Sequence, residues 1–305
     1  MMMIHDIHFA APPMLARRLK SDIETAFPDH RLTPPCTHLE MFEAAGAYGR
    51  SEAGADGARP PVMTITAYPQ LLTRVVEEGA AVAPLAQLAL PPLRPEIVAA
   101  GLTPPHPDVA LVAVVPLVPA VDRRQLPDFR GWDDLLPLIE AGHGVAAPPD
   151  DTPLPYLLSA FLARRWGLPE ARIRAALDRT SPPLEINKRL AAGDVAAGLL
   201  PPAFCRNSRG GEVRLVWPAD GALAAPVIAV LSPSAPCQSR DLLRSLLSPA
   251  MQRAFADLGG MVPVIDGIPG PAEMEAAGWS LLPTDWTDLL DQSRTMSRQL
   301  LQDSK

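Results

Sequence analysis

The stretch VALVAVVPLVPAVD, Val109–Asp122, is the longest apolar segment of the chain and decides its fold class. A continuous run of β-branched and aliphatic residues is typical of a strand that is buried on both faces of a sheet. The run Val109–Val118 contains Pro116 and, at about ten residues, has half the length of about 20 that a helix needs to cross a bilayer. It therefore predicts a central strand with helices packed on both sides.

Short strands and amphipathic helices alternate on either side of this stretch. Further strands are expected at residues 4–10, 61–66, 144–147, 195–200 and 227–231. The first helix is expected to begin at Pro13 and to bury apolar residues at four-residue steps, namely Leu15, Leu19, Ile23 and Phe27. The alternation predicts an α/β protein with mostly parallel strands, in which ligands bind beyond the carboxyl ends of the strands.

Composition and charge exclude several classes of protein. The chain has 305 residues, of which 48% are hydrophobic, enough for a substantial core. The net charge is −7 and no long basic stripe occurs, which argues against nucleic-acid binding. The first residues show no signal-peptide pattern. We therefore expect a cytoplasmic protein, or a periplasmic one only if a signal sequence or a preceding domain is missing.

Four motifs, in this order, resemble those of type II solute-binding proteins, the substrate receptors of ABC transporters. Together they cover roughly residues 108–264. They are the opening stretch followed by FRGWDDLL at 129–136, INKRLAAGDVAAGLL at 186–200, WPADGALAAP at 217–226, and LLRSLLSPAMQRAFADLGGMVPV at 242–264. The resemblance implies a type II periplasmic-binding-protein-like fold with two lobes, each a mostly parallel sheet flanked by helices.

The resemblance also implies how the chain is divided and what it does. Lobe one would comprise residues 1–110 and 226–305, and lobe two residues 111–225, with two crossover strands between them. A small-molecule or metal ligand would bind in the interlobe cleft, and a membrane transporter or another protein would be the partner. The alternative is a cytoplasmic enzyme or ligand sensor on the same fold, using Cys36, His38 or Cys205. The sequence leaves any cofactor unknown.

The residues expected to line the ligand site lie mainly in loops that follow strands. They are Pro12, Cys36, Thr37, His38, Thr66, Tyr68, Thr152, Pro202, Phe204, Cys205 and Gly221. No HExxH, GxSxG or P-loop motif occurs, and no carboxylate pair is spaced for acid–base catalysis. A binding protein is therefore expected rather than an enzyme.

Cys36, Thr37 and His38 form the densest reactive group in the sequence. They are interpreted either as a soft ligand pair or activated nucleophile, or as a surface loop with a partly buried thiol. If Cys36 and Cys205 faced each other, they could bind a thiophilic metal. Tyr68 is expected either to contact a ligand or to pack beside the proline that follows it.

Two loop segments are expected to have conformational roles. Asp150, Asp151 and Thr152 precede a helix, with Thr152 as its N-cap and Pro153 in its first turn. The two carboxylates would repel an anion at that helix end. Within WPADGALAAP, Gly221 is expected to allow a left-handed or closely approached backbone in a tight turn. The segment would then serve as a hinge between the lobes.

Overall fold

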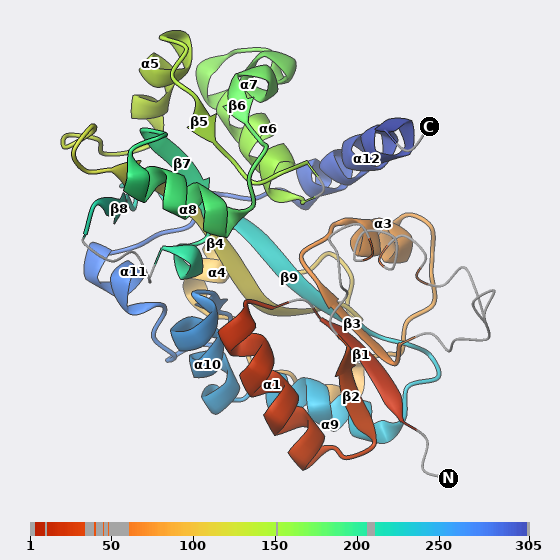
Figure 1. The fold of residues 1–305 in the computed structure, drawn as a ribbon. Coiled ribbons are helices and arrows are strands. Elements are labelled where there is room, and N and C mark those ends of the chain that lie inside the picture. The colour runs from red at the N-terminus through yellow and green to blue at the C-terminus, as the bar shows by residue number, and fades with distance from the viewer. Residues whose placement is uncertain are drawn as a thin grey trace. The chain divides into compact units, whose positions relative to one another are not determined.

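The computed structural model describes residues 4–9, 11–33, 40, 45, 48, 61–150, 152–205 and 211–303. The chain forms two compact units (Figure 1). Unit 1 comprises Met1–Val114, Pro226–Pro271 and Pro283–Lys305, and unit 2 comprises Val115–Ala225 and Ala272–Leu282. Residues 272–282, which the sequence assigned to lobe one, therefore group with unit 2.

The sheet of unit 1 is built on three parallel strands. Strand β1 (His5–Phe9) lies between β2 (His30–Thr33) and β3 (Met63–Thr66), with Ile7 opposite both Leu32 and Met63. Its helices are α1 (Pro13–Ala26), α3 (Gln70–Val76), α4 (Pro95–Ala99), α9 (Cys237–Leu246), α10 (Pro249–Gly259) and α12 (Trp286–Asp303), with the 3-10 turn η1 (Ala86–Leu88).

Helix α1 begins at Pro13 as expected, because proline suits the first helical turn. Leu15, Leu19 and Ile23 are buried on its inner face, which confirms the predicted apolar stripe up to that point. Helix α10 packs closely against α1. A Cβ on Gly259 of α10 would lie 2.8 Å from the Leu15 side chain of α1. Small residues at such a contact let two helices pack at short range.

The sheet of unit 2 is also parallel at its centre. Strand β5 (Val145–Ala146) pairs with β6 (Leu177–Asp178) on one side and with β7 (Ala197–Leu200) on the other. Strand β8 (Val213–Leu215) is antiparallel to β4 (Ala110–Asp122). The helical elements are η2 (Trp132–Asp134), α5 (Leu135–Glu140), α6 (Leu154–Trp166), α7 (Glu170–Ala176), α8 (Pro183–Ala192), η3 (Pro202–Phe204) and α11 (Ala272–Ala277), and the α-helices among them are labelled in Figure 1.

The opening stretch of the sequence forms strand β4, in which every residue except Val115 is buried. The strand continues beyond the predicted end at Val118, because β7 and β8 pair with its last residues. Pro119 is tolerated there, since its carbonyl still accepts a 2.8 Å bond from the Val216 N–H. The boundary between the two units falls after Val114, within this strand.

Strand β9 (Leu223–Leu231) is the second strand that passes between the units, and all of its residues are buried. It begins four positions before the predicted strand 227–231. In unit 1 it pairs antiparallel with β3, where Ala229 lies opposite Ile65. Strand β10 (Val262–Pro263) pairs antiparallel with the first half of β4.

Helix α12 packs on α3 within unit 1. The Thr73 hydroxyl lies 2.9 Å from that of Ser293, and Leu289, Leu290 and Met296 are buried. The apolar stripe of this helix thus packs within unit 1.

Candidate functional site

The carboxyl ends of β5, β6 and β7 lie along one edge of the unit 2 sheet because these strands are parallel neighbours. Three loops begin at this edge, at residues 147–153, 179–182 and 201–205. In sheets of this type, loops at the carboxyl edge carry the ligand-binding groups. This edge of the unit 2 sheet is therefore the candidate functional site.

Asp150, in the loop after β5, is shared by two arginines from other elements. Arg174, in the last turn of α7, places Nη2 3.3 Å from Oδ1 of Asp150. Arg179, directly after β6, contacts Oδ2 of the same carboxylate. The Arg174 and Arg179 side chains are 12% and 24% exposed, so both charges are largely withdrawn from water.

Tyr156, in the first turn of α6, completes this group. Its side chain is 1% exposed, and the Arg174 guanidinium carbon lies 4.5 Å from the centre of its ring. Burial raises the pKa of Tyr156, while the positive charge of Arg174 opposes that rise and Asp150 adds to it. The phenol therefore stays protonated at neutral pH and is a hydrogen-bond donor.

Two buried donors of this group lack an acceptor among the described residues, although the Arg174 guanidinium lies beside one of them and can donate to its oxygen. They are the hydroxyl oxygen of Tyr156 and Nε of Arg179. An unsatisfied buried polar group costs about 1–3 kcal/mol, and more when it is charged.

Asp178, the last residue of β6, and Arg189, in α8, form a neighbouring pair with its own partners. Arg189 donates from Nη2 to Oδ2 of Asp178 at 2.7 Å and from Nη1 to the Ser181 hydroxyl at 3.0 Å. Hydrogen bonds from Thr180, and then from Arg189, hold the pKa of Asp178 below its usual range. This pair orders the loop before α8, which leaves Arg174 and Arg179 with one carboxylate between them among the described side chains.

Thr152 does not cap α6, contrary to the prediction. The helix begins at Leu154, Pro153 occupies the N-cap position, and no side chain caps the helix. The Thr152 hydroxyl and backbone N–H both donate to the Pro149 carbonyl, at 2.9 and 3.0 Å. The local turn thus holds Thr152 on the Pro149 carbonyl, whereas an N-cap hydroxyl would accept a hydrogen bond from a backbone N–H in the first turn of the helix. Asp151 lies outside the described residues.

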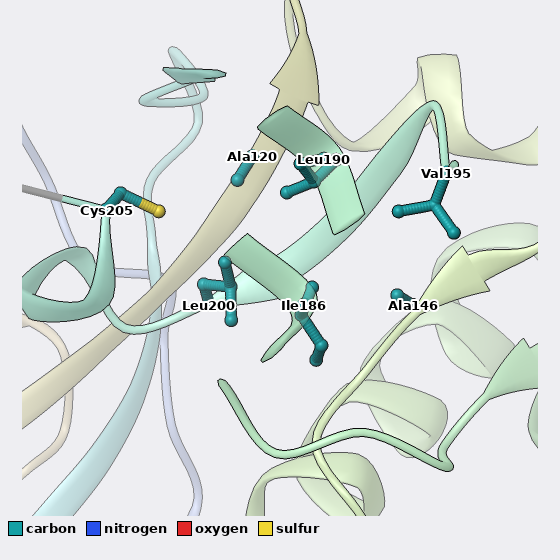
Figure 2. Packing of buried hydrophobic residues seen from close by; sticks show 7 residues of the cluster. All are labelled: Ala120, Ala146, Ile186, Leu190, Val195, Leu200 and Cys205. Carbon is teal, nitrogen blue, oxygen red and sulfur yellow. The ribbon is translucent and has the colours of Figure 1, made fainter. Parts of the chain in front are cut away.

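Cys205 ends the η3 turn and is packed into the apolar core of unit 2. It belongs to a cluster with Ala120, Ala146, Ile186, Leu190, Val195 and Leu200. Figure 2 shows Cys205 at one end of this cluster with its sulfur directed toward the other members. Burial, with a smaller contribution from Glu273, raises the pKa of the thiol to about 12. A thiol held neutral in this way is a poor nucleophile.

The remaining predicted residues of unit 2 in this region lie in the η3 turn itself. Pro202 is buried and Phe204 is partly exposed. Cys36, with which Cys205 was expected to share a metal, lies outside the described residues, as do Thr37 and His38. In the described ranges, no group of three or more His, Cys, Asp or Glu residues is placed to hold a metal ion.

The predicted residues of unit 1 that the structure describes lie at the carboxyl ends of β1 and β3. Pro12 is partly exposed at the N-cap position of α1. Thr66 and Tyr68 are 4% and 2% exposed, and the Tyr68 N–H donates to the Thr66 hydroxyl at 3.0 Å. Thr66 thus holds the turn after β3 through this bond. A ligand contact by Pro12, Thr66 or Tyr68 stays a prediction.

Gly221 has the special backbone that the sequence predicted. Its φ is 118°, and a Cβ there would lie 2.9 Å from the backbone of Leu281 and Leu282. Its N–H closes a turn on the Pro218 carbonyl at 3.0 Å, and its own carbonyl accepts a 2.9 Å bond from the Trp132 indole. Only glycine fits both the conformation and the close approach.

The turn that contains Gly221 is also held from α6 by an ion pair that the sequence analysis did not anticipate. Arg165 binds the Asp133 carboxylate with two hydrogen bonds, of 2.6 and 2.8 Å, and also pairs with Asp220. These bonds raise the pKa of Arg165 and lower that of Asp133. The turn is thereby fixed to η2 and α6 within unit 2.

Sequence reasoning also missed the role of Tyr156, Arg174 and Arg179, and assigned Asp150 only to helix capping. Two sequence positions were consistent with a place near the site. Tyr156 follows the loop after one expected strand, and Arg179 lies shortly before Ser181 and Pro182, where the next helix begins. Strand β6 has only two residues, so the position of Arg179 at a carboxyl end was not visible in the sequence pattern.

The chain belongs to a family of bacterial extracellular solute-binding proteins, whose model matches residues 61–290. A comparison with curated proteins finds no match. Similar solved structures include the ferric binding protein from Campylobacter jejuni, with a TM-score of 0.73 at 14% identity, covering 96% of this chain and 97% of that one. Iron-bound HitA from Pseudomonas aeruginosa has a TM-score of 0.72 at 14% identity, covering 97% and 99% of the two chains. Apo FutA2 from Synechocystis PCC6803 has a TM-score of 0.69 at 19% identity, covering 97% and 98%.

These findings confirm the expected α/β fold and the resemblance to type II solute-binding proteins. The protein is a ligand-binding protein of the kind that serves ABC transporters, and the enzyme alternative is not favoured. The expected cytoplasmic location finds no support, since the family is described as extracellular. Among the described helices, none is long and apolar enough to span a membrane.

Proposed function

We propose that the protein captures a small solute through the carboxyl edge of the unit 2 sheet and presents it to an ABC transporter. The single observation that carries the proposal is the joint placement of Asp150, Tyr156, Arg174 and Arg179 at that edge. Membership of the solute-binding family supports it, as does the packed state of Cys205. Closure of the two lobes on the ligand is part of the proposal and follows from the resemblance.

A ligand screen by thermal unfolding tests this function. The panel contains amines, sugars, carboxylates and phosphates, together with ferric iron and ferric citrate, because the titles of similar structures name iron and citrate. A ligand at 100 times its Kd should add about 2.7 kcal/mol to the free energy of unfolding. Titration calorimetry then gives the affinity and stoichiometry.

A matched pair of variants tests the location of the site. Arg174→Gln alters the proposed site, whereas Arg172→Gln changes an exposed arginine two positions earlier in α7. We expect the first change to weaken binding and the second to leave it unchanged. Equal affinities for both variants, or no stabilisation by any member of the panel, would overturn the proposal.

A further inference from the structure

We infer that the solute bears a carboxylate, which Arg174, Arg179 and Tyr156 bind beside Asp150; this inference rests on the proposed function. Asp150 shows how a carboxylate is held here, since its two oxygens are divided between two guanidinium groups from α7 and from the residue after β6. Tyr156 and Arg179, in the same cluster, present donors that Asp150 does not use.

The balance of charge favours an additional anion. Within the described part of the chain, two arginine side chains face one carboxylate in this group, because Asp178 is paired with Arg189. Counted over the described side chains alone, which do not include Asp151, the group carries one excess positive charge with little exposure to water. A second carboxylate neutralises that charge and gains charge-assisted hydrogen bonds.

The free donors also match this ligand. Tyr156 Oη and Arg179 Nε are buried and have no hydrogen-bond partner in the described ranges. The Tyr156 phenol feels the charges of Arg174, Asp150 and Arg179 together, so these four groups form one cluster. Both free atoms are N–H or O–H donors and require an acceptor, which a carboxylate supplies. An amine or another cation would leave both donors unsatisfied.

The sequence led to the expectation that Asp150 and Asp151 together would repel an anion at this helix end. That expectation considered the two neighbouring carboxylates in isolation. In the structure, Arg174 and Arg179 come from segments more than twenty residues away and oppose the charge of Asp150. The anion is recognised by side chains rather than by the helix end.

The inference makes opposite predictions for two substitutions at the site. Arg179→Gln removes a charge and the free Nε donor, so carboxylate binding should weaken by about tenfold or more. Asp150→Asn removes the competing negative charge, so binding should tighten by about threefold or more. Arg172→Gln is the control and should change nothing. A purely structural ion cluster would lower stability in both site variants without this opposite effect on affinity.

The experiment measures thermal unfolding and calorimetric binding of the whole protein with sodium citrate, with inorganic phosphate and with sodium chloride at equal ionic strength. Citrate should stabilise the protein beyond chloride and phosphate, with affinities in the order Asp150→Asn, unchanged protein, Arg179→Gln. Arg179→Lys keeps the positive charge but loses the planar guanidinium with its several N–H donors. Its affinity for citrate should therefore lie between those of the unchanged protein and Arg179→Gln.

Three results would overturn the inference. The first is a citrate effect equal to that of chloride in both the unchanged protein and Asp150→Asn. The second is a citrate effect that survives Arg179→Gln. The third is preference for phosphate over citrate. If a neutral or cationic solute from the panel binds tightly and is unaffected by Arg179→Gln, the proposed function stands and only the carboxylate inference fails.

Discussion

The two units carry the same kind of sheet edge with different chemistry. In unit 1, Thr66 and Tyr68 are buried after β3 and joined by a hydrogen bond between the hydroxyl of one and the backbone of the other. In unit 2, Asp150, Arg174 and Arg179 form a charged cluster with free donors. A shared topology thus places loops at the carboxyl edge, while the described side chains there are packed after β3 in unit 1 and charged in unit 2.

The largest expected effect is on the turn that completes unit 2. Gly221→Val places a Cβ at 2.9 Å from the backbone of Leu281 and Leu282, in a residue whose φ of 118° disfavours valine. We expect a loss of about 3 kcal/mol or more in the free energy of unfolding, measured by urea denaturation.

Asp220→Asn is the matched control for this substitution. It weakens an exposed ion pair with Arg165, so a loss of only about 0–1 kcal/mol is expected. If the two variants lost the same stability, the close approach at Gly221 would not be the reason for the glycine.

The next effect compares a cysteine from each unit. Cys205 has a pKa raised to about 12 by burial in unit 2, whereas Cys237 is exposed in unit 1. Alkylation by iodoacetamide near pH 8 should be slower at Cys205 by about three orders of magnitude than at an ordinary thiol. Peptide mass spectrometry over time measures both sites in one sample. Rapid labelling of Cys205 in the folded protein would contradict this prediction and support the alternative in which Cys205 acts as a nucleophile.

A smaller effect separates the two sheet edges directly. Thr66→Val removes the acceptor of the buried Tyr68 N–H, which should cost about 1–3 kcal/mol of stability and leave ligand affinity unchanged. Arg179→Gln should show the reverse pattern, with a large change in affinity and a small change in stability. Urea denaturation and calorimetry on both variants test this. A loss of affinity in Thr66→Val would show that the unit 1 edge also contributes to binding.

The smallest expected effect is that of His30 on the pH dependence of stability. His30 lies at the amino edge of the unit 1 sheet, opposite the carboxyl edge. Burial, and then the nearby His5, lower the pKa of His30, while Asp29 opposes the shift. The folded state therefore binds the His30 proton less readily than the unfolded chain does. Stability should fall as the pH falls below about 6.5. His30→Asn should reduce this slope between pH 7 and pH 5 in urea titrations, and an unchanged slope would assign it to other groups.

Several features of the fold were predictable because they depend on neighbouring residues in the chain. The apolar run of β4, the stripe Leu15–Ile23 of α1 and the conformation of Gly221 all follow from local pattern. The prediction was wrong where contacts with other parts of the fold set the bounds of an element or the partners of a side chain. Strand β9 starts at Leu223 because the segment is paired and buried, and Thr152 turns back to Pro149 instead of capping α6.

The candidate site was only partly predictable for the same reason. Cys205 follows a strand, as the ligand-site rule requires, yet its side chain turns into the apolar cluster rather than outward. Tyr156, Arg174 and Arg179 lie in α6, in α7 and after β6, so no spacing in the sequence relates them to one another. Thr37 and its neighbours Cys36 and His38 lie outside the described residues, and their expected role stays a prediction.

The sequence by itself determined the family, the α/β alternation and the need for glycine at residue 221. Periodicity, apolar runs and motif order are properties of the chain, and burial of apolar surface favours the same solution wherever they occur. Only the tertiary structure decided which polar groups meet. The parallel pairing of β5 with β6 brings Arg179 to Asp150, and the two helices between them, α6 and α7, bring Tyr156 and Arg174. Charges interact through space, so their balance at the site depends on strand register and helix packing rather than on sequence spacing.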